Sequence, residues 1–202
     1  MELNVPKIVN NIPKAKGTLV VNQITGGTSA NRTAIGYGSW IQLDNTYGLI
    51  ACVSADTYAK YVVIGIYDAG GERLNVQYVT AAQLVANTYL FEVIPIGGLI
   101  FEMTEDGLTT PITNANSTVY ADIIVTAPTE PKQLAMGLPG IAMPIIQIDS
   151  NTVNASSSGL LLQLLGLAPG LDNPAYSATA GSQRNFYAKV IDAVAQEAQS
   201  TN

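Results

Sequence analysis

Three acidic residues that lie close together in the chain are the first candidates for catalysis. Glu102, Glu105 and Asp106 lie in or next to the stretch 104–107, and a pair of carboxylates is what glycoside hydrolysis requires. A tight turn is predicted at 104–107, where we expect solvated acids. The chain also contains no histidine, which excludes catalysis by Ser-His or Cys-His pairs. We therefore expect that the protein is not an enzyme.

Metal and phosphate sites have little support in the sequence. One cysteine and no histidine cannot complete a zinc site, and the alternating acidic loop of a calcium site is missing. The segment 25–29, with Arg32 after it, has the glycine and hydroxyl composition of a phosphate cradle. It lacks the Gly-Lys-Ser/Thr ending of a phosphate-binding loop. We expect no metal and no cofactor.

Two aromatic residues are candidates for binding a partner. Tyr37 and Trp40 lie in the motif Gly36-Tyr37-Gly38-Ser39-Trp40, which predicts exposed aromatic side chains between glycines. Such side chains form either a sugar-binding platform or a protein interface. We favour the interface, because tyrosine combines an apolar ring with a hydroxyl that stays in contact with water.

Three lysines near the start of the chain are further candidates. Lys7, Lys14 and Lys16 against Glu2 give residues 1–16 a charge of +2, whereas the other six basic and fourteen acidic residues give −8. A basic arm before an acidic body is suited to docking on an acidic neighbour, including a copy of itself. A frayed terminus is the alternative.

The overall composition indicates a protein whose surface is covered by partners. Hydrophobic residues make up 48% and charged residues only 12%, whereas soluble domains average about 25% charged. A surface with so few charges is poorly protected against association. Extensive, permanent interfaces deplete charge in this way.

The same composition excludes several other partners. The net charge of −6 argues against nucleic acid, because no basic stripe offsets phosphate repulsion. The longest apolar run, 159–170, is too short and too interrupted to cross a membrane. Cys52 lies in an apolar run, which predicts a buried, inert thiol and synthesis in a reducing cytosol.

Residue types predict a mainly β fold: an antiparallel β-sandwich or barrel-like domain over residues 17–202, after an extended N-terminal arm of residues 1–16. The segment 80–86 predicts one or two helical turns capped by Thr80, and 151–158 predicts a polar loop. The expected strands are 18–21, 39–43, 47–54, 61–67, 73–80, 89–94, 99–103, 119–126 and 141–148, the last broken by Pro144.

Two segments fit more than one structure. The run 158–167 fits either a capped helix or a strand. The run 184–199 has helical spacing throughout, but its first half also alternates as a strand does. A short C-terminal helix is therefore one of two readings.

Three groups of residues, in this order, carry a resemblance to a known class of proteins. They are Gly65-Ile66-Tyr67 with Asp68-Ala69-Gly70-Gly71; Leu90-Phe91-Glu92-Val93 with Glu105-Asp106-Gly107; and Leu161 to Pro169 with Leu171-Asp172-Asn173 and then Phe186 to Val190. Loosely, over residues 50–192, the chain resembles head decoration, or cement, proteins of tailed phages. The resemblance implies that the Leu-Gly-Leu-Ala-Pro stretch is a buried strand, Asp-Asn-Pro its turn, and 187–191 a returning strand.

The resemblance and the composition together imply a structural virion protein. Such a protein binds the outside of a phage head, with the major capsid protein and copies of itself as partners, in trimers among other candidate oligomers. It is made in the host cytoplasm and located on the capsid surface. The alternative is a carbohydrate-binding or adhesion module displayed on a virion, in which Trp40 contacts the sugar.

Overall fold

Strands with alternating buried and exposed residues make up most of this protein, whose structure is a computed structural model. The structure describes residues 6–8, 19–22, 26–28, 32–54, 58–106, 112, 119–127, 144–157, 159–169 and 184–191. Lys14, Lys16, the turn at 172–174 and the run after residue 191 lie outside these ranges. The described residues form antiparallel sheets and one short helix, which confirms the mainly β prediction.

The first sheet, sheet A, has six strands in which every neighbour is antiparallel. Five of them are long enough to bury one row of side chains while the other row faces outward. Their order across the sheet is β1 (Lys7–Ile8), β9 (Phe101–Thr104), β13 (Asn185–Val190), β12 (Leu162–Leu167), β10 (Val119–Thr126) and β11 (Ile145–Asn154).

Sheet A curls until β9 meets β11. After β9 the chain reaches Glu105, which forms a parallel bridge with Ile148 of β11. On its other side the Glu105 amide donates to the Arg184 carbonyl at 2.9 Å, and the next amide, of Asp106, donates to Ile148 at 3.0 Å. The strands from β9 to β11 therefore enclose a small barrel, in agreement with the barrel-like alternative.

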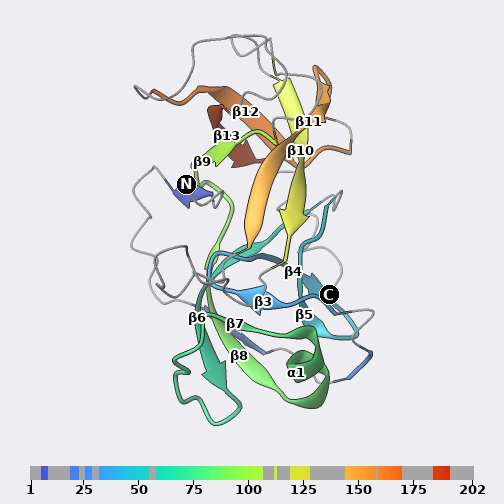
Figure 1. Cartoon of the computed structure of the whole chain (residues 1–202), viewed down its shortest axis with the longest axis vertical. Coiled ribbons are helices and arrows are strands. Elements are labelled where there is room, and N and C mark those ends of the chain that lie inside the picture. The colour runs from blue at the N-terminus through green and yellow to red at the C-terminus, as the bar shows by residue number, and fades with distance from the viewer. Residues whose placement is uncertain are drawn as a thin grey trace, which may run out of the picture.

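The second sheet, sheet B, has five strands, with a two-stranded sheet C and one helix beside it. The order in sheet B is β2 (Leu19–Asn22), β8 (Tyr89–Pro95), β6 (Tyr61–Asp68), β4 (Trp40–Asp44) and β5 (Gly48–Ala51). Sheet C pairs β3 (Ile35–Gly36) with β7 (Tyr78–Val79), and the helix is α1 (Ala81–Ala86). Figure 1 shows the barrel at one end of the long axis and sheet B with α1 at the other.

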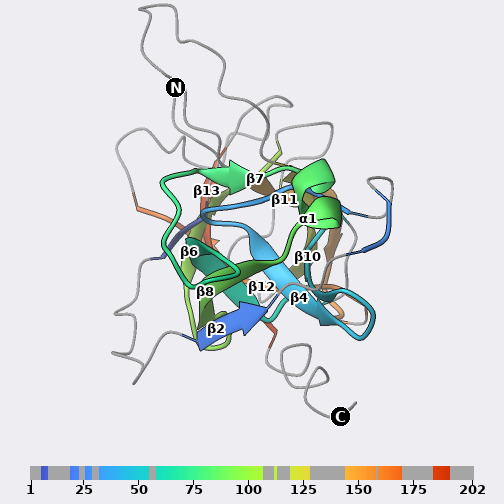
Figure 2. The ribbon, with the colours of Figure 1, turned by 90° about the horizontal axis from the view of Figure 1, so that it is seen from below.

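Sheet B is buried on both faces. Trp40, Val62 and Ile94 belong to a core shared with the barrel. Their neighbours Ile41, Val63 and Val93 belong to a second core, which includes residues of β3, β7 and α1. Figure 2 shows α1 and β7 on one side of sheet B. Because alternate residues of one strand enter two cores, the barrel and sheet B pack as one body.

The start of the chain adds an edge strand to each sheet. β1 pairs with β9 at one edge of sheet A, and β2 pairs with β8 at one edge of sheet B. Part of the predicted arm, residues 7 and 8, therefore takes part in sheet A. The domain boundary at residue 17 stays a prediction.

Helix α1 follows the prediction at Thr80. The Thr80 hydroxyl accepts from the Gln83 amide, and the Gln83 side chain accepts in turn from the Thr80 amide. This reciprocal pair is a capping box, which satisfies amides that would otherwise be unpaired at the start of a helix. Leu84 is the buried residue of the helix and joins the second core.

Several predicted elements were wrong in part. The described residues of 158–167 and 184–191 contain strands β12 and β13, so the helical reading fails there and the strand reading holds. The resemblance also implied a buried strand over Leu-Gly-Leu-Ala-Pro, which is wrong in part, because Leu165 is 46% exposed and β12 ends at Leu167. Residues 151–154 belong to strand β11 and are not a polar loop. The segment 73–80 was predicted as one strand, but it pairs with β6 only at Arg73. It then crosses to pair with β3, and the Gln77 carbonyl accepts from the Tyr37 amide beside this second pairing. Val76, whose alternation suggested a strand, is 41% exposed.

Candidate interaction face

Trp40 does not form a surface site. Its side chain is 1% exposed and packs in the core shared with the barrel, where its ring centroid lies 4.9 Å from that of Phe101. The predicted exposure of Trp40 is therefore wrong. The glycines of the motif do form a turn, but the turn ends at Gly38, and Trp40 already lies in strand β4.

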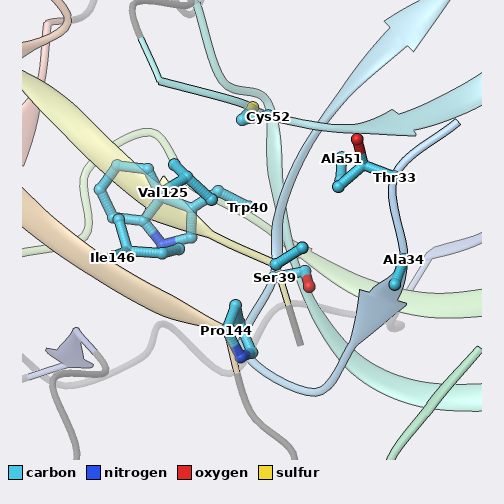
Figure 3. Close-up of a pocket in the computed structure, with 10 residues that line it drawn as sticks. Thr33, Ala34, Ser39, Trp40, Ala51, Cys52, Val125, Pro144 and Ile146 are labelled. Carbon is cyan, nitrogen blue, oxygen red and sulfur yellow. The ribbon is translucent and has the colours of Figure 1, made fainter. Parts of the chain in front are cut away.

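A small crevice beside Trp40 offers no binding site for a sugar. Figure 3 shows it between Ser39 and Cys52 on one side and Val125, Pro144 and Ile146 on the other. Its volume is about 10 Å³, which is room for about one water molecule. The crevice is thus a packing gap between sheet B and the barrel.

Tyr37, the other predicted aromatic, is half-buried and belongs to a polar cluster on sheet B. Interaction with the Tyr37 side chain raises the pKa of Arg73. The Tyr67 hydroxyl donates to Glu92 Oε2 at 2.9 Å, and that bond raises the pKa of Tyr67. A tyrosine with a raised pKa is a poor proton donor at neutral pH. The cluster is thus suited to holding the surface in shape, not to acid–base catalysis.

Gly65 makes room for this cluster, and alanine in its place is expected to destabilise the fold. A Cβ at residue 65 would lie 2.5 Å from Glu92 Oε2 and 2.8 Å from Glu92 Cβ. We expect Gly65→Ala to lower the free energy of unfolding by about 1–3 kcal/mol, as overpacking does. Urea denaturation would measure this, with Gly70→Ala as the control, since the nearest atom to a Cβ there is a flexible carboxylate oxygen at 3.3 Å.

The same substitution has a consequence for pH dependence. Because the folded-state pKa of Tyr67 is raised, its hydrogen bond to Glu92 stabilises the fold below the ordinary pKa of tyrosine and is lost as the pH rises through the raised value. Displacement of Glu92 in Gly65→Ala should therefore lower the pKa of Tyr67 toward its ordinary value. A tyrosinate absorbance titration that matches wild type would contradict this account of Gly65.

The three candidate catalytic acids have separate structural roles. Glu102 accepts from the Asn185 amide group at 3.2 Å. Glu105 is 0% exposed, so the expectation of a solvated acid was wrong there, and it pairs with Arg184 at 2.6 Å. Asp106 accepts from the Ser150 hydroxyl at 2.6 Å. Within the described part of the chain, no group of three or more Asp, Glu or Cys side chains is placed to hold a metal ion.

Arg32, next to the glycine-rich loop, is also committed to structure. Its Nε donates to the Gly26 carbonyl at 3.3 Å, and its Nη1 donates to the Leu49 carbonyl at 3.5 Å. The guanidinium lies 4.2 Å from the centre of the Tyr47 ring, and burial lowers the pKa of Arg32. An arginine that ties a loop to β5 in this way does not present a phosphate cradle.

The outer side of the barrel carries both neutral and charged side chains. Buried residues alternate along β13, so Tyr187 and Lys189 lie on the outside. Gln163 of β12 pairs across strands with Lys189 and with Tyr120 of β10, and Tyr187 pairs with Glu102 of β9. Leu165, at the irregularity in β12, is 46% exposed. We call this surface the barrel face; it consists of Glu102, Tyr120, Gln163, Leu165, Tyr187 and Lys189.

No protein family, curated protein or solved structure was found to match this chain. The described residues also contain no helix that is long and apolar enough to cross a membrane.

The barrel face includes two tyrosines among its six residues, Tyr120 and Tyr187, and interface centres are enriched in tyrosine. Its charged residues are Glu102 and Lys189, which have opposite sign, and the other four side chains are neutral. The first of the predicted lysines, Lys7, lies beside this face, because Lys7 of β1 is the cross-strand partner of Glu102.

Sequence reasoning missed the barrel face, although one signal was present. The alternation from Phe186 to Val190 showed that Tyr187 and Lys189 would lie on the same side of a strand. It did not show that β13 would neighbour both β12 and β9, which is what gathers these residues into one surface.

Proposed function

We propose that this chain is a structural virion protein, a decoration or cement protein that binds the outside of a tailed-phage head. Its partners are the major capsid protein and copies of itself, and its place is the capsid surface after synthesis in the host cytoplasm. The observation that carries this proposal is the barrel face, a surface of a six-stranded sheet on which neutral side chains predominate. The composition of the chain supports it as well, because only 12% of the residues are charged, which leaves a surface poorly protected against association.

The distribution of charge supports the same proposal. Residues 1–16 carry a net charge of +2 and the rest of the chain −8, and the backbone of residue 7 pairs with Glu102 of β9. Opposite charges at the rim of an interface steer and orient association. The segments that carry the resemblance to decoration proteins form β6, β8, β12 and β13, so they include two of the strands that build the face.

The mechanism follows from the chemistry of the face. Hydroxyl, amide and aliphatic groups lose less hydration energy on contact than ionised groups do, so this surface associates at low cost. Each contact of standard size covers about 800 Å² per partner. Repetition over the symmetric shell links neighbouring shell subunits and raises the force needed to break the head.

A charge placed at Leu165 is expected to weaken binding to heads. Leu165→Lys puts an unpaired cation into a contact that excludes water, which costs enough to reduce affinity by at least about tenfold. The substitution should leave the fold intact, since exposed positions tolerate change within about 0.5 kcal/mol. The assay is co-sedimentation of the purified protein with phage heads that lack it.

Val76→Lys is the matched control for this experiment. Val76 is also an exposed aliphatic residue, but it lies near sheet C, away from the barrel. We expect Val76→Lys to bind heads as wild type does. Equal binding by both variants would show that the barrel face is not the contact, and a wild-type protein that does not bind heads would contradict the proposed function as a whole.

A further inference from the structure

A groove is present at the end of the molecule opposite the barrel (Figure 1). It lies between the turn that follows β6 and the connection from α1 to β8, and it holds about 550 Å³. Sites for small ligands commonly have about 300–1,000 Å³. Figure 1 shows both of these connections at the α1 end of the long axis. The groove is therefore large enough for a ligand, unlike the crevice beside Trp40.

The floor of the groove is rigid. Asp68 and Tyr89 are cross-strand partners at the end of β6 and the start of β8, and Tyr89 packs against the second core. The Asp68 Oδ1 accepts from the Glu72 amide at 2.8 Å, which fixes the direction of the carboxylate. Leu74, also on the groove, packs against the same core. A ligand would thus meet a preformed surface, which lowers the entropic cost of binding.

The walls supply groups that both donate and accept hydrogen bonds. Asn87 and Thr88 line one side and the backbone of Gly70 lines the other. An amide side chain donates and accepts, a hydroxyl does both, and a carboxylate accepts. The ring of Tyr89 adds an apolar surface with a polar tip. Vicinal sugar hydroxyls, each a donor and an acceptor beside apolar C–H groups, are complementary to this set.

The charge of the groove selects against anionic ligands. Among the described residues that line it, Asp68 is acidic and none is basic. A phosphate, sulfate or carboxylate would be repelled by Asp68 without a compensating cation. A purely apolar ligand would cover the side chains of Asn87 and Thr88 without forming hydrogen bonds to them.

From these observations we infer that this groove, which we call the distal groove, is a binding site for neutral saccharides. Asp68, Asn87 and Thr88 bind sugar hydroxyls, and Tyr89 contacts a sugar face. The sugar-binding platform predicted at Trp40 is excluded, because Trp40 is buried in the core. The distal groove is the sugar site that we propose in its place. The binding itself does not depend on the proposed function. The residues that line the groove and those of the barrel face are different.

The test is a printed glycan array, with neutral glycans and sialylated or sulfated glycans as separate classes, probed with the labelled full-length protein. We expect signals from neutral glycans only. Asn87→Ala should reduce the affinity for the best of them by about tenfold, the effect of one lost hydrogen bond to a ligand. The helix should not be affected, because it uses the backbone amide of Asn87 and not its side chain.

Asn45→Ala is the matched control, since Asn45 is an exposed asparagine in the turn after β4, outside the groove. It should bind as wild type does, and all variants should show the same thermal unfolding. An array without signals, signals from anionic glycans alone, or equal binding by Asn87→Ala and wild type would each overturn the inference. Head binding is measured separately with Leu165→Lys, so failure of one proposal does not imply failure of the other.

Discussion

Replacing Glu105 by leucine is expected to lower the free energy of unfolding by about 3–5 kcal/mol, the cost of leaving one charge of a buried ion pair alone. Glu105 Oε1 accepts from Arg184 Nε at 2.6 Å, and both side chains are fully buried. Glu105 Oε2 accepts from Arg184 Nη2 at 3.3 Å and from the Ile112 amide at 3.2 Å. The substitution therefore removes three hydrogen bonds at the point where the barrel closes.

The Ile112 backbone explains why this pair matters for the barrel. Its amide donates to Glu105 and its carbonyl accepts from Arg184 at 2.9 Å, so the ion pair holds residue 112 on both sides, as a neighbouring strand would. The Ile112 side chain is buried in the barrel core. Loss of either charged partner removes one of the two hydrogen bonds that hold Ile112 in the barrel core.

The double variant Glu105→Leu with Arg184→Met distinguishes the charge effect from lost packing. Replacing both members of a buried pair by apolar residues is often neutral or stabilising. Here the Ile112 amide and carbonyl would still lose their partners, so we expect the double variant to be more stable than either single variant but less stable than wild type. Urea denaturation measures all three. Single substitutions that cost no more than Glu72→Gln, at an exposed acid, would contradict the role of the pair.

Replacing Trp40 by alanine is expected to cost about 3–5 kcal/mol of unfolding free energy, the range for a large aromatic residue in a core. Trp40 is packed against Phe101, and it stands where sheet B meets the barrel. Its loss opens a cavity between the two parts of the molecule. The effect should appear in one cooperative transition, because the same core contains residues of both parts.

Tyr37→Ala provides the comparison within the same motif. Tyr37 is half-buried and lies against the second core, so its truncation should cost less than that of Trp40. Thermal or urea unfolding of the two variants side by side gives the answer. A Trp40→Ala protein with wild-type stability would mean that Trp40 is not part of the core, and would restore it as a candidate for surface contacts.

Elements that depend only on neighbouring residues in the sequence could be predicted. The prediction of 119–126 has the bounds of β10, and Thr80 predicted the capped helix. Trp40 was missed because sheet B is buried on both faces. In such a strand alternation does not distinguish inside from outside, and the flanking glycines suggested exposure.

The long-range contacts could not be predicted from the sequence. Glu105 and Arg184 are 79 residues apart, and no periodic pattern connects them. Glu105 appeared as one of several acids at a turn, whereas its burial depends on closure of the barrel by β11. The barrel face and the distal groove could not be predicted for the same reason, because each combines strands or turns that are distant in the sequence and adjacent only in the fold.

The measurement that tests the proposed function most directly is the copy number of this chain in purified particles of the phage that we propose carries it. Quantitative mass spectrometry, with the major capsid protein as the internal reference, gives the ratio of the two chains. A cement protein repeats with the shell lattice, so we predict a fixed, simple ratio to the capsid protein that persists through density-gradient purification. Particles that contain the capsid protein but only traces of this chain would contradict the proposal.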